Sequence, residues 1–178
     1  MGLRDRRHAR QDDRHGTRTY RMRQRLVAIG DDFWIEDEQG HRAYKIDGKA
    51  MRFRKTMLLE DAGGHALYKI QERKLRVHQT MEIEDAVGNT VATVKKALIT
   101  PLRERFDVHV EGGQDLEVQG NVVDHEYRIS AGRDKVAEVS KKWFRIADTY
   151  GVEVAEDQDQ ALVLAIAAVV DSMTHETG

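Results

Sequence analysis

The chain has 178 residues, of which 40% are hydrophobic and 34% charged, and its formal net charge is −2. This length and composition are typical of one globular domain with a charged surface, and they exclude a chain that is disordered throughout. The absence of cysteine excludes disulfide bonds, thiolate metal ligands and cysteine redox chemistry. Because residues 1–25 also contain no apolar signal segment, we expect a cytoplasmic protein.

The amino-terminal region is strongly basic. Residues 1–25 contain nine arginines and three aspartates, a charge of +6, so residues 26–178 carry −8 to give the total of −2. We predict that residues 1–18 form a disordered basic tail, since they offer almost no apolar side chain to a core, and that residues 19–175 form the domain. An arginine-rich arm can contact nucleic-acid phosphates. Tails of this composition are more often simply solvated, so we do not expect nucleic acid as a partner.

A template recurs three times at a constant interval, with Glu36, Glu60 and Glu84 in equivalent positions. Each copy has an apolar residue followed by Glu-Asp, then a glycine shortly afterwards, then a second stretch of alternating polar and apolar residues. The copies are Ile35-Glu36-Asp37 with Gly40 and Tyr44-Lys45-Ile46, Leu59-Glu60-Asp61 with Gly64 and Tyr68-Lys69-Ile70, and Ile83-Glu84-Asp85 with Gly88 and Val94. The pattern predicts successive β-hairpins, none of which can bury its apolar face alone.

Strand patterns extend on both sides of the repeat. A fourth copy around Gly112 alternates one residue out of phase, and Pro101 before it predicts a crossover. Alternation of apolar and polar residues predicts strands at residues 20–27, 33–37, 42–46, 50–54, 57–61, 65–70, 75–78, 82–85, 91–95, 106–110, 115–119, 125–130, 135–142 and 150–154.

The carboxy-terminal segment has a different pattern. Ala161–Val170 is an uninterrupted apolar run, and Asp157 and Asp159 precede it, where they can cap a helix. A helix over residues 157–173 would be apolar on every face and must be surrounded by protein. Its uncharged part would cover about 15 Å, short of the roughly 30 Å hydrocarbon core, so we expect no transmembrane span. We predict a closed antiparallel barrel of short strands around this helix.

Several segments, in this order, resemble the LURP-one-related family. They are Tyr20–Leu26, Gly30–Gly40, Tyr44–Lys49 and Trp143–Val154, followed by the apolar helix that ends at Val170–Met173. The resemblance covers about residues 20–173. It implies a mainly β fold like the tubby carboxy-terminal domain and the phospholipid scramblases, a barrel of about twelve strands around a hydrophobic carboxy-terminal helix. It implies little about activity, because many members of the family have no assigned biochemistry.

The repeat also aligns basic residues. If Tyr44 and Tyr68 face the core, Lys45 and Lys69 face outward. We predict a basic ligand-binding patch at such positions, namely Lys45, Lys49, Arg52, Arg54, Lys69, Arg73, Lys74, Arg76, Lys95 and Lys96. These residues could contact phosphate-bearing ligands such as lipid headgroups, and the phosphoinositide binding of tubby domains points the same way. Outward charges that keep strands soluble and protect sheet edges are the alternative interpretation.

No other motif identifies a reaction. His41 and His65 occupy equivalent places after a hairpin glycine, but a metal site would need a third ligand; the pattern places His78, His109 and His125 in strands. The acidic run over residues 148–157 lies where scramblases have a proposed calcium-binding segment, yet it departs from an EF-hand loop. Glycine-rich phosphate loops and nucleophile elbows do not occur. We therefore expect no catalytic residues, no metal ligands and no cofactor.

The resulting hypothesis is a non-catalytic binding or interaction module. Its expected partner is an anionic lipid or phosphoinositide surface, or another protein, and its expected location is the cytoplasm or the periphery of a membrane. Two alternatives remain: a scramblase-like membrane-lipid or calcium-binding protein, and an enzyme whose site is not visible in the sequence. The sequence does not predict the identity of the ligand or the oligomeric state.

Overall fold

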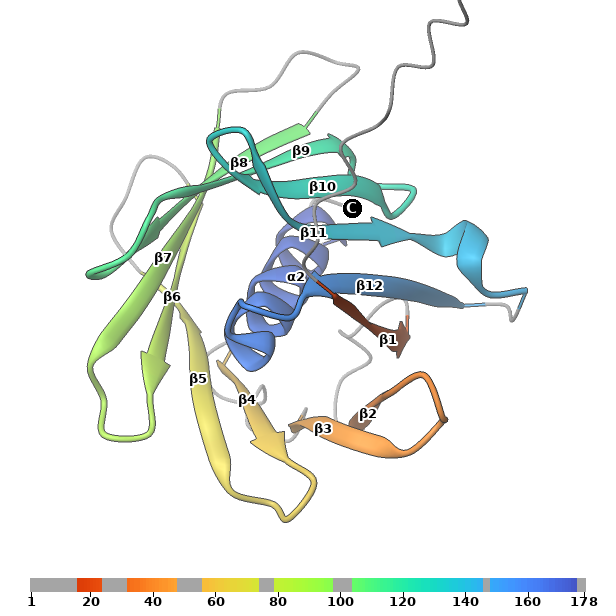
Figure 1. Ribbon diagram of the computed structural model, residues 1–178. Helices are drawn as coiled ribbons and strands as arrows, with labels where there is room; N and C mark the ends of the chain where they lie inside the picture. Colours follow the sequence, from red (N-terminus) through yellow and green to blue (C-terminus); the bar gives the residue numbers. More distant parts are fainter. Residues whose placement is uncertain are drawn as a thin grey trace, which may run out of the picture.

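A computed structural model describes residues 16–23, 32–47, 56–73, 79–97, 104–145 and 148–175. These residues form twelve β-strands, a short 3-10 helix and a long carboxy-terminal helix (Figure 1). The predicted strands at 50–54 and 75–78, Pro101, and residues 1–15 of the predicted tail lie outside the described residues.

The strands follow one another along the chain with short connections. Their bounds are β1 (Thr17–Arg23), β2 (Phe33–Glu36), β3 (Arg42–Asp47), β4 (Thr56–Asp61), β5 (Ala66–Glu72), β6 (Thr80–Asp85), β7 (Thr90–Lys96), β8 (Glu104–Val110), β9 (Leu116–Asn121), β10 (Glu126–Ala131), β11 (Asp134–Ser140) and β12 (Thr149–Ala155). The 3-10 helix η1 (Lys141–Trp143) precedes β12, and α2 (Gln160–His175) follows it. β1 starts at Thr17, before the predicted domain boundary at residue 19.

The strands close into one antiparallel barrel, which confirms the predicted fold class. Each strand pairs with its neighbours in sequence, and β1 closes the ring by pairing with β12. The crossover predicted at Pro101 is therefore wrong, because β7 and β8, on either side of it, pair directly. Side chains alternate between the interior and the outer face, as in β6, where Met81 and Ile83 are buried and Glu82 and Glu84 are more exposed. Closure gives every strand a paired neighbour on each side.

The three copies of the repeat form the hairpins β2–β3, β4–β5 and β6–β7. In each turn the aspartate side chain accepts two backbone N–H groups, as Asp61 does from Gly63 (2.8 Å) and His65 (2.9 Å). The hydrogen bond from the His65 backbone holds the pKa of Asp61 below its ordinary value. The turn glycine has a positive φ, for example +84° at Gly64, a conformation that other residues adopt with strain.

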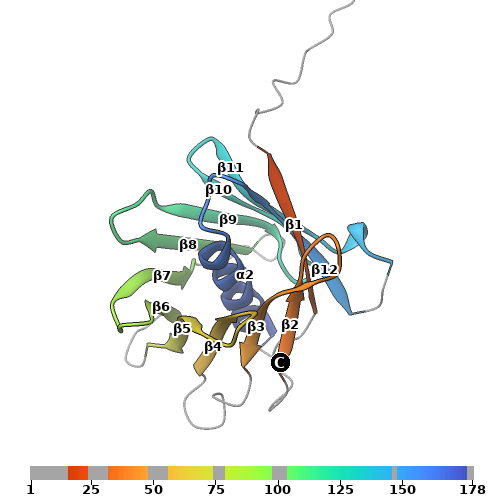
Figure 2. The same cartoon turned by 60° about the horizontal axis from the view of Figure 1, so that its bottom comes forward.

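The apolar helix α2 lies inside the ring of strands (Figures 1 and 2). Every residue from Val163 to Val170 is buried, and the inward side chains of the strands pack against them as one core. Burial of each large aliphatic side chain contributes roughly 1.5–3 kcal/mol. The helix starts at Gln160 rather than at residue 157, because Asp159 caps it by accepting the backbone N–H of Leu162 at 2.9 Å.

The two ends of the barrel differ in construction. One end, here called the turn end, carries the hairpin turns Asp37–Gly40, Asp61–Gly64 and Asp85–Gly88 and the start of α2. There the Tyr68 hydroxyl donates to the Asp159 carboxylate at 2.7 Å and ties β5 to the helix. The second half of α2 lies toward the opposite end.

A buried polar pair holds the second half of α2 in the barrel. His125 Nε2 lies 2.5 Å from Asp171 Oδ1, and both residues are almost fully buried. The His125 ring stacks on Tyr150, with 4.3 Å between ring centroids. His125 was predicted in a strand, but it lies in the β9–β10 turn with φ +53°, a conformation that turns its side chain out of the strand alternation and toward the helix.

Two tyrosine hydroxyls border this pair. Tyr127 and Tyr150 are buried, and within the described part of the chain neither hydroxyl has a hydrogen-bond partner. Burial raises the pKa of both phenols, and the Asp171 carboxylate raises them further. Both side chains therefore remain uncharged phenols in the core.

The core role of α2 predicts a graded response to truncation. Leu164 is fully buried, so Leu164→Ala should lower the free energy of unfolding by about 2–5 kcal/mol through lost burial and a cavity. The control is Leu162→Ala in the same helix, where the side chain is only partly buried and the loss should be smaller. Urea unfolding followed by circular dichroism measures both. Equal losses would contradict the placement of α2.

The buried pair predicts a large effect of removing one partner. Asp171→Ala leaves His125 buried without its carboxylate and should cost about 3–5 kcal/mol of unfolding free energy. Glu138→Ala, which removes a surface ion pair with Lys135, should cost about 1 kcal/mol or less. A double-mutant cycle with His125→Ala separates the pairwise coupling from the cavity. Absence of coupling between residues 125 and 171 would refute the contact.

Candidate functional site: an arginine–aromatic face

The predicted basic patch is largely neutralised by neighbouring strands. Five of its members are among the described residues: Lys45, Lys69, Arg73, Lys95 and Lys96. Four of these five form ion pairs, which are Lys45–Glu60 (2.6 Å), Lys69–Glu84 (3.1 Å), Arg73–Glu82 (2.7 Å) and Lys96–Glu104 (3.1 Å). Lys49, Arg52, Arg54, Lys74 and Arg76 lie outside the described residues. Ligand binding by the set as a whole stays a prediction.

These ion pairs follow the repeat. Lys45 lies directly opposite Glu60, and Lys69 directly opposite Glu84, on antiparallel neighbours. Arg21, one repeat interval upstream of Lys45, lies opposite Glu36 and pairs with it. β1 is therefore part of the repeat, since Tyr20-Arg21-Met22 aligns with Tyr44-Lys45-Ile46. Opposite charges across a strand pair stabilise the register.

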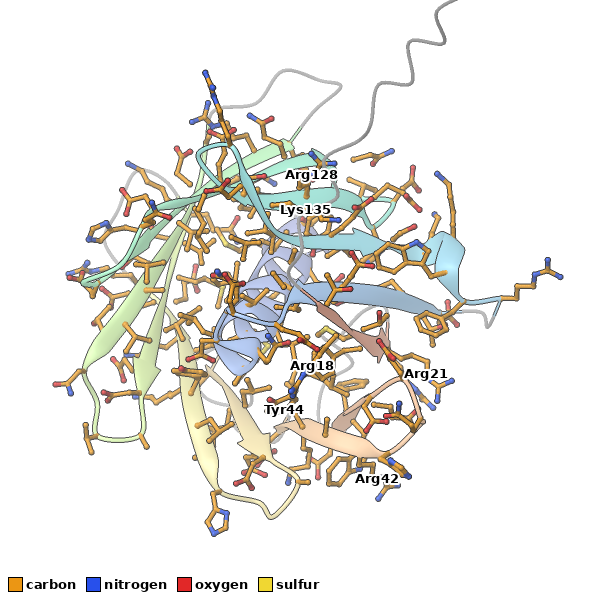
Figure 3. All side chains as sticks on the ribbon, viewed as in Figure 1. Arg18, Arg21, Arg42, Tyr44, Arg128 and Lys135 are labelled. Carbon is orange, nitrogen blue, oxygen red and sulfur yellow. The ribbon has the colours of Figure 1, made fainter. Side chains whose placement is uncertain are left out.

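Uncompensated cations occur on another part of the outer surface, over β12, β1, β2 and β3. Within the described ranges, the exposed side chains of Arg23 and Arg42 have no carboxylate partner. The Arg42 guanidinium lies over the Trp34 ring at 4.5 Å from its centroid, a cation–π contact. Figure 3 shows Arg21 and Arg42 on the same side of the barrel.

Aromatic side chains from the η1 segment extend this surface. Trp143 and Phe144 lie over Gly151 of β12 so closely that a Cβ at this position would come within 2.6 Å of Trp143 and 2.8 Å of Phe144. Arg21 lies 5.9 Å from the centroid of the Phe144 ring, and Trp143 is 40% exposed. The absence of a side chain at Gly151 thus allows the rings of Trp143 and Phe144 to pack directly against β12.

We call this surface the arginine–aromatic face. It consists of Arg21, Arg23, Trp34, Arg42, Trp143 and Phe144. Its three arginines against Glu36, the partner of Arg21, and Asp32, which lines the same cavity as Arg23 and Arg42, give a formal charge of +1. The sequence prediction missed this face because the stacking partners come from separate strands, and because the residues next to Trp34 in the sequence are apolar or acidic, not basic.

A further cavity lies on the outer face of β7 to β10. It has a volume of about 730 Å³ and is lined by Lys95, Arg105 and Arg128 together with Asp107, Asp115 and Glu117. Arg105 bridges Asp107 (3.0 Å) and Glu117 (2.8 Å). The lining charges of this groove therefore cancel, three against three, with histidine taken as neutral.

A second cavity, of about 660 Å³, opens at the turn end beside β1. We call it the mouth cavity. Its lining includes Tyr20 and Tyr44, whose ring centroids are 5.9 Å apart, and Figure 3 shows Arg18 close to Tyr44. Its charged lining residues are Asp37, Glu38, Asp61 and Glu156 against Arg18, a formal charge of −3. The mouth cavity is therefore acidic, whereas the arginine–aromatic face is basic.

The histidines of the hairpin turns are engaged locally. His41 Nδ1 lies 3.4 Å from Asp37 Oδ2, and His65 Nδ1 lies 3.0 Å from Asp61 Oδ2, each within its own turn. Of the acidic run, Glu153 pairs with Lys135, and Glu156 lies 4.0 Å from Arg18. The described residues contain no group of three or more His, Asp or Glu side chains arranged to hold a metal ion. In the same residues, no helix has the length and apolarity that a membrane crossing requires.

Comparison with known proteins identifies the family to which the chain is similar. The family model described as LURP-one-related matches residues 18–171. The uncharacterized protein YxjI of Bacillus subtilis (strain 168) is 30% identical over 86 residues, which cover 48% of this chain and 51% of that protein. The match thus spans about half of the relative's length.

A solved structure shares the fold. The X-ray structure of the Arabidopsis thaliana protein AT5G01750 superposes with a TM-score of 0.67 at 17% identity, covering 89% of this chain and 92% of the other. At this identity the likeness concerns the fold alone. The family match spans nearly the whole domain, from β1 into the second half of α2, and the chain therefore belongs to the LURP-one-related family.

Proposed function

We propose that this protein is a non-catalytic binding module that docks on anionic lipid headgroups through its arginine–aromatic face. The observation that carries the proposal is the presence of two cations without a carboxylate partner, Arg23 and Arg42, next to the Trp34 ring. A guanidinium that is not already paired can form bidentate hydrogen bonds with a phosphate.

The composition of the face supports a membrane surface as the partner. Tryptophan is enriched at the membrane–water interface, because its ring is apolar and its N–H is polar. Cations close to an anionic leaflet each contribute roughly 1 kcal/mol of attraction. Trp34 lies beside Arg23 and Arg42, and the partly exposed Trp143 lies over Gly151 of β12, so shallow contact by the rings and headgroup contact by the arginines can occur together.

The predicted patch on β3 to β7 contributes less in this proposal. Lys45, Lys69, Arg73 and Lys96 would each have to leave a carboxylate before binding a phosphate. Lys45 is also only 20% exposed. Phosphate binding at these residues therefore competes with pairing inside the sheet, which is the reason for assigning the contact to the arginine–aromatic face.

Scramblase-like activity through insertion of α2 would require a larger structural change than peripheral docking does. If α2 were to enter a membrane, the inward side chains of the strands would lose the helix against which they pack, and the barrel interior would open to water. Peripheral docking leaves the barrel intact. The proposal therefore uses only groups that are already on the surface.

Vesicle co-sedimentation tests the proposal. Wild-type protein should pellet with vesicles that contain phosphatidylserine and a phosphoinositide, should be released by high salt, and should stay in solution with neutral phosphatidylcholine vesicles. The Arg23→Glu/Arg42→Glu variant should lose at least tenfold in vesicle affinity, because it reverses the charges of both arginines that contact the headgroups in this proposal.

The matched control is Arg128→Glu/Arg133→Glu, a charge reversal of two exposed arginines on β10 and in the β10–β11 turn. It should reduce binding to a much smaller extent. Equal losses for the two variants would show that only net charge matters and would refute the assignment to this face. Equal recovery with neutral and anionic vesicles would refute headgroup binding.

A further inference from the structure

The seam between β1 and β2 is the least paired join of the barrel. β1 is in register with β12 over its whole length, from Thr17↔Ala155 to Arg23↔Thr149. Among the described residues it is in register with β2 only at Arg21↔Glu36, whereas every other pair of neighbouring strands shares at least four positions. Within the described residues, the register between β1 and β2 is thus reduced to one position.

Backbone groups of β1 face this seam. The Glu156 N–H donates to the Gly16 carbonyl at 2.8 Å, so the alternation of an antiparallel ladder directs the backbone of Thr17 and Thr19 away from β12. The Thr19 N–H donates to the Glu38 side chain at 3.0 Å, not to a carbonyl of β2. A side chain therefore occupies a position that a paired strand normally takes.

A cavity lies on each side of the Arg21–Glu36 contact. The mouth cavity is lined by Thr17 to Tyr20 of β1 and by the β2–β3 turn. On the other side, a cavity of about 350 Å³ is lined by Arg23 of β1 and by Phe33 and Trp34 of β2. The side chains of the Arg21–Glu36 ion pair between them are 31% and 28% exposed, and ion pairs at such sites hold weakly.

We propose that the seam is a docking site for an extended peptide, which adds as a strand along the β1 edge and separates Arg21 from Glu36. Strand addition would give Thr17, Thr19 and Arg21 backbone partners, while the flanking cavities would receive alternate side chains. One of these cavities is lined by Arg23, Trp34 and Arg42 of the arginine–aromatic face, so a bound peptide would compete with headgroups there, whereas the mouth cavity takes no part in the headgroup contact.

The charge of the mouth cavity specifies the chemistry of the peptide. Its four carboxylates against Arg18 favour a cationic side chain at this end. A strand antiparallel to β1 would place its carboxyl-terminal residues there, because Thr17 lies at the turn end. The expected ligand is therefore an extended segment with alternating apolar side chains and arginine or lysine near its carboxyl end.

A locked seam provides the direct test. The natural chain has no cysteine, so the one intramolecular disulfide that Arg21→Cys/Glu36→Cys can form crosses the seam, between residues that already lie opposite each other, and the monomeric oxidised protein is the species to test. The probe is a short fluorescent peptide of alternating threonine and valine with two arginines near its carboxyl end. Fluorescence anisotropy should show binding to wild-type protein, a loss of at least tenfold in affinity for the oxidised variant, and recovery on reduction.

Two control peptides separate strand addition from charge attraction. The same peptide with alternate backbone amides methylated keeps its charge but cannot complete the ladder, and should not bind. A version with two glutamates in place of the arginines should bind at least tenfold more weakly. Equal binding of the methylated peptide, or undiminished binding to the oxidised variant, would overturn the proposal.

Two further outcomes would also overturn it. If wild-type protein does not bind the arginine peptide, the seam is not a peptide site. If size-exclusion chromatography with light scattering shows a wild-type dimer that the seam disulfide converts to a monomer, the occupant is a second copy of this chain.

Discussion

The burial of α2 inside the barrel is the interaction on which the rest of the structure depends. A helix that is apolar on every face is not stable when exposed to water. A barrel of twelve strands has an interior too wide to be filled by the side chains of the strands alone. The helix fills the interior of the barrel, and the strands shield Val163 to Val170 of the helix from water. Because packing occupies the interior, the groups free to meet a partner are on the outer face, at the ends and at the β1–β2 seam.

Charges on the outer face divide into two kinds. The Arg21–Glu36, Lys45–Glu60 and Lys69–Glu84 pairs recur with the repeat and fix the register of the sheet. Arg23 and Arg42 stand outside this ladder, beside aromatic rings. A basic residue at a repeated position therefore mainly stabilises the pairing of strands, whereas a basic residue outside the repeat is a better candidate for ligand binding.

Much of the architecture could be predicted from the sequence, because hairpin turns and an all-apolar helix have strong local signals. The ion pairs between strands could not be predicted in the same way, because Lys45 lies opposite Glu60 only once the register of β3 and β4 is known. The one signal in the sequence was that Arg21–Glu36, Lys45–Glu60 and Lys69–Glu84 have the same spacing. The buried pair was also missed. Asp171 directly follows the apolar run and has the pattern of a helix end, while His125 reaches it only through a positive φ in a turn.

The central claim is that the barrel around α2 is a rigid scaffold that binds partners through its surface. Hydrogen–deuterium exchange with and without anionic vesicles tests this claim most directly. The account predicts slower exchange in β1, β2, β3 and η1 when vesicles are added, with the amides of α2 protected to the same degree in both conditions. Faster exchange in α2 on addition of vesicles would show that the helix leaves the barrel and would contradict the account.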